Sequence, residues 1–370
     1  MAGKACFDRA RRLVRTERAV QNQPKAPDEQ DRGDASPKVS DAELLARAAG
    51  ASRALHEAVA ARVVGQEAVI ELMLVALLSR GHALLVGVPG LAKTLLVASL
   101  GEALELDFGR VQFTPDLLPA DITGTDVLQE DEDKQGGVHR RVRFLPGPIF
   151  HNLILADEIN RTPPKTQAAL LQAMQERRVT VGTVTHTLPD PFQVFATRNP
   201  IEQEGTYPLP EAQLDRFLLE IHVEYPSETE EREIARRTTS ADVGTVPRVL
   251  STAEVRALQA LVPRIPVTDA AVSLAVALGR ATRPMAAGGS AGVKQVDEYV
   301  RFGAGPRGSQ ALVLAAKARA ALRGEAAADV DDVKALVNPV LRHRLVMSYR
   351  AEAEGVRDTD VLKSVLDAVS

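Results

Sequence analysis

Residues 87–94 limit the possible folds of this chain more than any other part of its sequence. They read Gly-Val-Pro-Gly-Leu-Ala-Lys-Thr and stand between the apolar run 82–86 and a helical pattern. A strand, a glycine-bearing loop, Lys-Thr and a helix in this order are typical of a phosphate-binding loop, in which backbone N–H groups surround phosphate oxygens. The usual pattern has glycine directly before the lysine, where this chain has Ala92.

Two side chains of this loop are expected to act on a nucleoside triphosphate. Lys93 would reach the β- and γ-phosphates, and Thr94 would hold Mg²⁺. The predicted nucleotide-binding residues of the loop are Gly87, Val88, Pro89, Gly90, Leu91, Ala92, Lys93, Thr94 and Leu95.

A second motif ends in two carboxylates. Residues 153–156 form an apolar run, typical of a strand buried on both faces, and Asp157 and Glu158 follow it directly. Ligands of open α/β sheets bind at the carboxyl ends of the strands, so both motifs point to one crevice. We expect Asp157 to lie beside the Mg²⁺ and Glu158 to orient or deprotonate the attacking water. The alternative is that the two carboxylates only cap a helix starting near Pro163; together with the loop, they predict a Mg²⁺-dependent NTPase.

Composition and charge exclude several classes of protein. The 370 residues carry a formal net charge of −4 and only 4% aromatic residues, which does not favour a nucleic-acid binder. The single cysteine, Cys6, excludes an intrachain disulfide, and the histidines show no metal-ligand spacing. No apolar stretch approaches the roughly 20 residues of a membrane helix. We therefore expect a cytoplasmic protein that is not inserted in a membrane.

The residue patterns divide the chain into three parts. Residues 1–40 are predicted to be a disordered tail. Residues 41–225 alternate between strand and helix patterns, which predicts a parallel sheet with crossover helices, and residues 226–370 read as a helical domain. The predicted strands are 82–87, 108–113, 152–157, 192–198 and 216–223.

Local signals refine this division. Residues 125–129 and 138–144 flank a charged, glycine-bearing tip, and residues 178–185 alternate Thr and Val, so both segments are predicted to be inserted β-hairpins. Ser227 and Ser251 each precede a glutamate by three residues, which predicts a capping box at the start of a helix. Further helical patterns cover 268–280, 309–323, 329–337 and 359–369.

Several segments resemble those of AAA+ ATPases, in which an αβα core is followed by a helical lid. Residues 63–66, with Val64, Gly65 and Gln66, resemble the segment that packs on adenine. Asn199 matches the sensor-1 residue, and a neutral amide can both donate to phosphate and accept from water. Arg216 matches the arginine finger that acts on the neighbouring subunit's nucleotide, with a local salt bridge to Asp215 or Glu211 as the alternative. Arg307 matches sensor 2, which contacts the γ-phosphate of its own chain; the alternative is an arginine on a solvated helix start.

The resemblance narrows to the MoxR family, which shows alanine before the loop lysine. It extends from about residue 45 to the C-terminus and is carried by residues 87–94, 119–124, 153–167, 209–217 and 339–344. It implies ATP and Mg²⁺ as cofactors and a homo-oligomeric ring, as a hexamer. It also implies chaperone-like remodelling of a client protein, one type of which bears a von Willebrand factor A domain.

Three other interpretations stay open. The first is a relative of the magnesium chelatase ATPase subunit, which shares the inserted hairpins and drives metal insertion. The second is a DNA-acting motor, against which the acidic charge and low aromatic content stand. The third is a scaffold that binds nucleotide without hydrolysis, which the presence of Lys93, Asp157, Glu158 and Arg216 disfavours.

Overall fold

The structure is a computed structural model of the chain, and it describes residues 40–132, 138–202, 204–239, 244–289 and 292–369. The predicted tail (1–40) lies outside the described residues apart from Ser40, as do residues 133–137 at the predicted tip of the first hairpin. Residues 40–370 form one compact unit. None of the described helices is both long and apolar enough to cross a membrane.

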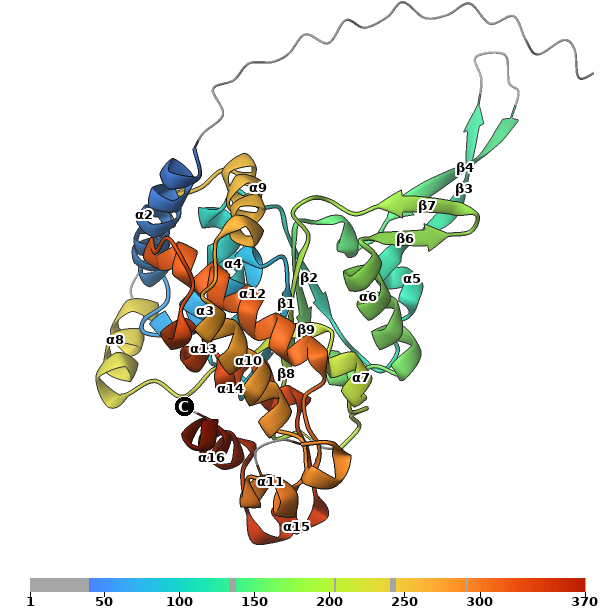
Figure 1. The fold of residues 1–370 in the computed structure, drawn as a ribbon. Coiled ribbons are helices and arrows are strands. Elements are labelled where there is room, and N and C mark those ends of the chain that lie inside the picture. Colours follow the sequence, from blue (N-terminus) through green and yellow to red (C-terminus); the bar gives the residue numbers. More distant parts are fainter. Residues whose placement is uncertain (1–39, 133–137, 203, 240–243, 290–291, 370) are drawn as a thin grey trace, which may run out of the picture. The chain divides into compact units, whose positions relative to one another are not determined.

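A five-stranded sheet lies at the centre of this unit (Figure 1). Its strands are β1 (His82–Val86), β2 (Phe108–Gln112), β5 (Leu153–Asp157), β8 (Gln193–Arg198) and β9 (Phe217–His222). They pair in the order β2-β5-β8-β1-β9, and every pair is parallel. All the predicted strands are confirmed to within one residue at each end. Because β8 lies between β5 and β1, the segment after β8 falls between the phosphate loop and the two carboxylates.

Successive strand residues point into two apolar cores on opposite faces of the sheet, as the two-residue period of a strand requires. In β1, Ala83 and Leu85 belong to one core, whereas Leu84 and Val86 belong to the other. All of β1 is therefore buried, which is the pattern of a parallel strand covered by helices on both sides.

Helices cover both faces of the sheet (Figure 1). The first core contains buried residues of α2 (Asp41–Ala60), α3 (Glu67–Leu78) and α4 (Lys93–Ala103), and the second contains those of α6 (Pro164–Glu176). Short elements connect the rest: α5 (Pro119–Thr123), α7 (Glu211–Leu214) and the 3₁₀ helices η1 (Pro148–Phe150) and η2 (Ile159–Arg161).

Both predicted hairpins are confirmed. The first consists of β3 (Gly124–Glu132) and β4 (Val138–Pro146), which pair in continuous register, and the second of β6 (Arg178–Val181) and β7 (Val184–Thr187). The ring of Phe144 on β4 stacks on that of His186 on β7, with centroids 3.9 Å apart. This contact joins the two hairpins at their bases.

The C-terminal part is mainly helical, as predicted. Its helices are α8 (Glu228–Thr238), α9 (Thr252–Leu261), α10 (Asp269–Ala281), α11 (Lys294–Tyr299), α12 (Pro306–Arg323), α13 (Val330–Ala335), α14 (Val337–Leu341), α15 (Tyr349–Glu354) and α16 (Asp358–Val369), with 3₁₀ turns η3 (Val262–Arg264), η4 (Met285–Ala287) and η5 (Arg342–Arg344). The capping boxes at Ser227 and Ser251 are confirmed. The sequence analysis missed a short antiparallel pair, β10 (Val300–Phe302) with β11 (Val346–Met347), because two or three residues are too few to show a period.

This helical part shares one core with the first sheet face. Buried alanines and leucines of α12 belong to the same cluster as those of α2 and α3. The shared core explains why residues 40–370 form one compact unit, although the sequence patterns change near residue 226.

Candidate nucleotide-binding site

The phosphate loop has the backbone conformation that favours glycine. Gly90 has a φ of 86° and Ala92 a φ of 56°, both in the left-handed region. Glycine adopts this region without steric cost, whereas other residues do so at a cost of roughly 1–2 kcal/mol, which explains the glycine of the usual pattern at position 92. Ala92 is also the N-cap of α4, whose first backbone N–H groups have no partner within the helix and are available to phosphate.

Lys93 lies folded back over this loop. Its Nζ donates to the carbonyl oxygens of Gly87 at 2.5 Å and Val88 at 2.8 Å. Burial lowers the pKa of Lys93, and the charges of Asp157 and Glu158 oppose this by raising it. The two sequence motifs therefore meet in one electrostatic site, in which phosphate oxygens would replace the two carbonyls as acceptors.

Thr197 on β8 holds the Asp157 carboxylate and the backbone of Glu158. Its hydroxyl donates to Asp157 Oδ1 at 2.6 Å and accepts from the backbone N–H of Glu158 at 2.8 Å. Glu158 itself has a φ of 58°, a left-handed conformation that a non-glycine residue adopts only when its surroundings impose it. Thr197 lies two residues before Asn199, but a single threonine in a strand carries no signal of this role.

Each carboxylate has a further partner that the sequence analysis did not single out. On β2, Arg110 Nη2 donates to Asp157 Oδ2 at 2.7 Å, and Gln112 Nε2 donates to Glu158 Oε2 at 2.7 Å. Arg161 Nε lies 3.2 Å from Glu158 Oε2. A signal was available, because Arg110 and Gln112 are exposed on alternate positions at the carboxyl end of a strand.

Asn199 lies between the loop and the carboxylates, as the strand order requires. It is buried, and its Oδ1 accepts from the backbone N–H of Ile201 at 3.2 Å. A cavity of about 430 Å³ opens in front of it. This cavity, called here the phosphate cavity, is lined by Pro89, Gly90, Leu91, Ala92, Lys93, Thr94, Leu95, Arg110, Asp157, Glu158, Thr197 and Asn199.

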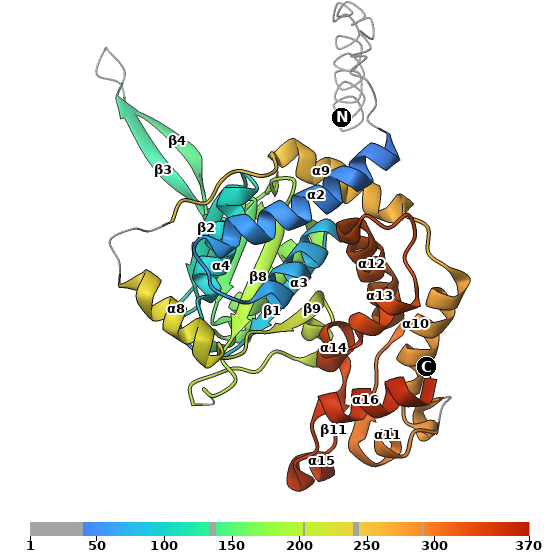
Figure 2. The same ribbon diagram turned by 90° about the vertical axis from the view of Figure 1, so that its left-hand side faces the viewer.

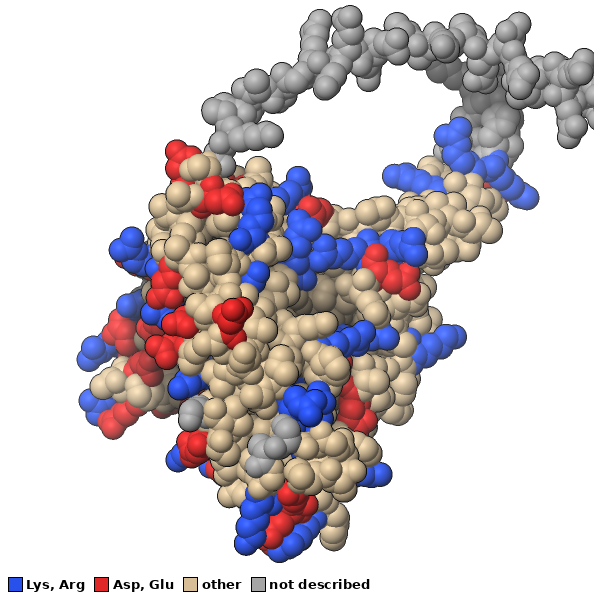
Figure 3. Space-filling view, viewed as in Figure 1, with Lys and Arg blue, Asp and Glu red and all other residues tan. Residues whose placement is uncertain are grey.

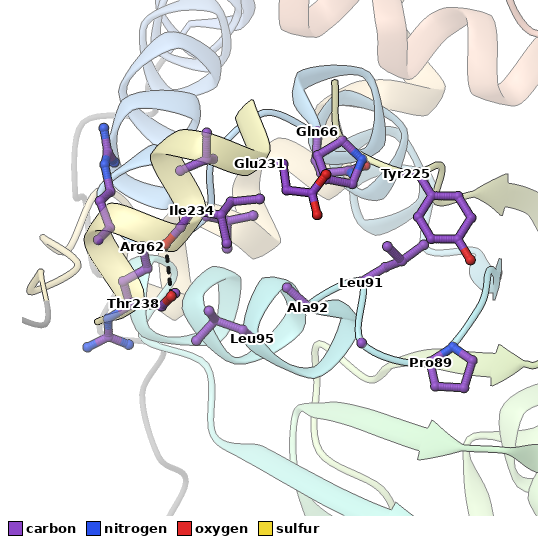
Figure 4. Close-up of a pocket in the computed structure, with 15 residues that line it drawn as sticks. Arg62, Gln66, Pro89, Leu91, Ala92, Leu95, Tyr225, Glu231, Ile234 and Thr238 are labelled. Atoms are coloured by element: carbon purple, nitrogen blue, oxygen red, sulfur yellow. Dashed lines mark hydrogen bonds between the residues drawn. The ribbon is translucent and has the colours of Figure 1, made fainter. Parts of the chain in front are cut away.

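A second cavity of about 320 Å³ adjoins the first and shares residues 89–92 and Leu95 with it. Val64 and Gln66, two of the residues predicted to pack on adenine, line it together with Ile234 of α8 (Figure 4). Its lining is mainly apolar, which suits a purine base, whereas the phosphate cavity is charged. The two adjoining cavities therefore match the two ends of a nucleotide.

Gly65, between Val64 and Gln66, is not among the residues that line this second cavity. It has a φ of 70°, and a Cβ at this position would lie 2.2 Å from Glu230 Oε1. Glycine thus lets the 63–66 segment approach the start of α8, and the Gln66 amide fixes the segment further by donating to the carbonyl O of Glu224 at 3.1 Å.

Arg216 and Arg307 line neither cavity of their own chain. Arg307 is predicted to contact the γ-phosphate of its own chain, and in this structure, which holds no nucleotide, its Nη1 lies 3.4 Å from Asp215 Oδ2. Asp215 Oδ1 accepts from Arg344, so this carboxylate is engaged by two other arginines and not by Arg216. Among the described residues, the Arg216 side chain has neither the Asp215 nor the Glu211 salt bridge considered as its alternative.

The donor set of the phosphate cavity fits Mg²⁺. The Thr94 hydroxyl and the Asp157 carboxylate both line it, and hard oxygen donors are what this ion prefers. Within the described ranges, no group of three or more His, Cys, Asp or Glu side chains is placed to hold a metal. One or two protein oxygens suffice for Mg²⁺ when phosphate and water supply the remaining ligands.

Replacing Thr197 by Val is expected to lower the rate of ATP turnover about 10- to 100-fold, because loss of preorganised orientation at a reacting group costs this much. At nearly constant side-chain volume, the change removes the hydroxyl that holds the Asp157 carboxylate and the backbone N–H of Glu158. Steady-state kinetics would measure it, with Thr197→Ser as the matched control that keeps the hydroxyl. A Val variant as active as the Ser variant would show that Thr197 does not orient the site.

Two matches to family models agree with this geometry. Residues 82–219 match the ATPase family associated with various cellular activities (AAA), and residues 294–365 match the AAA lid domain. The crystal structure of a protein assigned as an ATPase from Cytophaga hutchinsonii superposes with a TM-score of 0.79 at 38% identity, over 89% of this chain and 97% of that one. A parallel-sheet core with a phosphate loop, paired carboxylates and a helical lid defines this protein as an AAA+ ATPase.

Relatives then specify the family. The chain is 44% identical to Chaperone MoxR1 of Mycobacterium tuberculosis over 312 residues, which covers 83% of this chain and 79% of that protein. It is 40% identical to the uncharacterized protein YeaC of Bacillus subtilis over 308 residues, covering 83% and 90% of the two chains. The chain belongs to the MoxR family of chaperone-like AAA+ ATPases.

Proposed function

We propose that this ATPase works as a homo-oligomeric, hexameric ring that hydrolyses Mg²⁺·ATP in the cytoplasm to remodel a client protein. In this proposal residues 41–225 are the nucleotide-binding core and residues 226–370 the lid. The observation that carries it is Arg216: among the described residues the side chain of this partly exposed arginine has no hydrogen-bond or ion-pair partner, while the phosphate cavity holds the other residues of a hydrolytic site. An arginine finger supplied by a neighbouring subunit fits both facts.

Each residue of the site has a role in this proposal. Lys93 and the first N–H groups of α4 bind the phosphates, and Thr94 and Asp157 hold the Mg²⁺, which would neutralise phosphate charge. Glu158, oriented by Thr197 and Gln112, accepts a proton from the attacking water, and Asn199 positions that water.

The two hairpins are the proposed contact with the client. Leu128 and Val142 face each other across β3 and β4 and are 61% and 65% exposed, which leaves an apolar pair on an extended arm. Lys and Arg atoms also lie along this arm in Figure 3. The strand β4 carries three exposed arginines, Arg140, Arg141 and Arg143. A client bearing a von Willebrand factor A domain is the partner that the family resemblance suggests.

The ring proposal is tested by ATP turnover per subunit across a range of protein concentrations. If Arg216 acts in a neighbouring site, turnover rises steeply with concentration for the native protein and is lost in Arg216→Ala. Turnover that is independent of concentration and survives in the variant would mean a monomeric ATPase.

Mixing two inactive variants then separates the subunits' contributions. A Glu158→Gln subunit lacks its own catalytic carboxylate but keeps its finger, whereas an Arg216→Ala subunit has the reverse defect. Because a ring interface is formed by two different faces, random mixing restores about a quarter of the sites. The same mixing with Arg307→Ala locates Arg307: activity returns if it acts on the neighbour and stays absent if it acts on its own chain.

A further inference from the structure

Residues 339–344, which carry part of the family resemblance, have no role in the site described so far. They include parts of α14 and η5, and α14 packs beside β9 (Figure 2). The last of them, Arg344, is a buried arginine whose side chain is only 4% exposed. A buried guanidinium is stable only with partners for its charge and its N–H groups, so its partners indicate what it does.

Arg344 reaches from the helical part to the segment that carries Arg216. Its Nε donates to Asp215 Oδ1 at 2.8 Å, and its Nη2 donates to the carbonyl O of Phe217 at 2.8 Å. Its Nη1 donates to the carbonyl O of Leu218 at 3.2 Å. One guanidinium therefore holds the residue before Arg216 and the two residues after it.

Other contacts hold Arg344 itself in place. Its Nη1 also donates to the carbonyl O of Val340 and lies 2.8 Å from His343 Nε2. Burial, helped by the Arg344 charge, lowers the pKa of His343 to about 3, so the imidazole is neutral. Its Nε2 also lies 3.1 Å from the carbonyl O of Phe217, and the tautomer decides whether it accepts from Arg344 or donates to Phe217. Gly308 of α12 lies close to the aliphatic part of Arg344: a Cβ added at Gly308 would be 3.4 Å from Arg344 Cδ.

Arg216 thus combines a fixed backbone with an unengaged side chain. Its own N–H donates to the carbonyl O of Gln213 at 3.2 Å, and the ring of Phe217 is fully buried. In the part of the chain that the structure describes, the guanidinium of Arg216 forms no hydrogen bond or ion pair. This combination suits contact with a nucleotide on another subunit, since a fixed backbone lowers the entropy lost when the side chain binds.

We propose that Arg344 is the positioning residue of the arginine finger Arg216. This inference rests on the proposed function, in which Arg216 acts on the nucleotide of a neighbouring subunit. The planar fork of Arg344 serves three acceptors in different directions, which a lysine ammonium cannot reproduce. Without it, the residues on both sides of Arg216 lose three hydrogen bonds to the helical part and keep the contacts of Arg307 with Asp215 and of His343 with Phe217.

The test compares Arg344→Lys with Arg342→Lys. Arg342 is a matched control, because it lies in the same 3₁₀ turn and its side chain is only 17% exposed. It pairs with Asp358 and Glu220 and not with the residues on either side of Arg216. Arg344→Lys is expected to lower kcat about 10- to 100-fold, the usual cost of misplacing a reacting group by about an ångström. Its affinity for ATP and its assembly should stay native, and Arg342→Lys should keep the native kcat.

Mixing distinguishes a misplaced finger from a damaged subunit. An Arg344→Lys subunit keeps its own Glu158, so mixing it with Glu158→Gln subunits should restore activity to about the level reached with Arg216→Ala, because the defect then lies in the finger that each subunit donates. Asp215→Asn, which keeps the shape of the acceptor and removes its charge, is expected to lower kcat in the same way and to be restored by the same mixing.

Three results would overturn the positioning role: native kcat in Arg344→Lys, an equal loss in Arg342→Lys, or no recovery on mixing although Arg216→Ala recovers. If Arg216→Ala itself does not recover on mixing, the neighbouring-subunit finger of the proposed function is wrong, and the role of Arg344 falls with it. The two failures are thus told apart in one set of assays.

Discussion

Glu158→Gln is expected to reduce ATP turnover by about 10²- to 10⁴-fold, the usual contribution of a general base, while ATP still binds. Glutamine keeps the size of the side chain and can still accept the hydrogen bond from Gln112, so the cavity keeps its shape. It cannot accept a proton from water. At about 1.4 kcal/mol per tenfold change, the loss corresponds to roughly 3 to 5 kcal/mol of transition-state stabilisation.

The measurement is single-turnover hydrolysis together with the dissociation constant of ATP. Glu176→Gln, an exposed glutamate on α6, serves as the control for the loss of one negative charge. Turnover in Glu158→Gln within a few-fold of the control would mean that another group activates the water, and the assignment of Glu158 would be wrong.

Lys93→Ala is expected to weaken ATP binding by at least about 100-fold, because each hydrogen bond to a charged group contributes about 1.5–3 kcal/mol and the ammonium would make two or more with the phosphates. The charges of Asp157 and Glu158 raise the pKa of Lys93, so its ammonium offsets part of their negative charge, together with Arg110 and Arg161. Its loss would leave the carboxylates to repel the incoming triphosphate.

Calorimetric titration with ATP at constant Mg²⁺ measures this change. Lys165→Ala, which removes an exposed lysine of α6, is the control. Lys93→Ala also loses the contacts of Lys93 Nζ with the Gly87 and Val88 carbonyls, so the melting temperature of this variant without nucleotide is measured in parallel. Native affinity in Lys93→Ala would mean that the phosphate cavity does not bind the triphosphate.

Much of this site could be predicted because the residues within each of its motifs are close together in the sequence. The phosphate loop, the apolar strand before Asp157 and the strand before Asn199 are each continuous segments whose pattern indicates their structure. The rule that ligands bind at the carboxyl ends of parallel strands then brought these segments to one edge, and the strand order β2-β5-β8-β1-β9 agrees.

The partners of the carboxylates could not be predicted in the same way. Arg110 and Gln112 come from β2 and Thr197 from β8, and they meet Asp157 and Glu158 only because these strands are neighbours of β5. A single Arg, Gln or Thr in a strand has many possible roles, and its partner across the sheet depends on register. The contact of Arg307 with Asp215 has the same origin, since the motif around Arg307 carries no signal for this partner.

The sequence alone determined the class of the protein, its α/β core with two inserted hairpins and a helical lid, and the residues of the phosphate loop. These properties follow from local patterns, since turn geometry, strand period and helix capping depend on residues a few positions apart. Only the tertiary structure decided which side chains orient the carboxylates, where Arg307 lies, and that Arg344 holds both sides of Arg216. The contacts with the carboxylates join neighbouring strands that are about 40 to 50 positions apart in the chain. Those of Arg344 span more than a hundred positions, and packing of the helical part against β9 creates them.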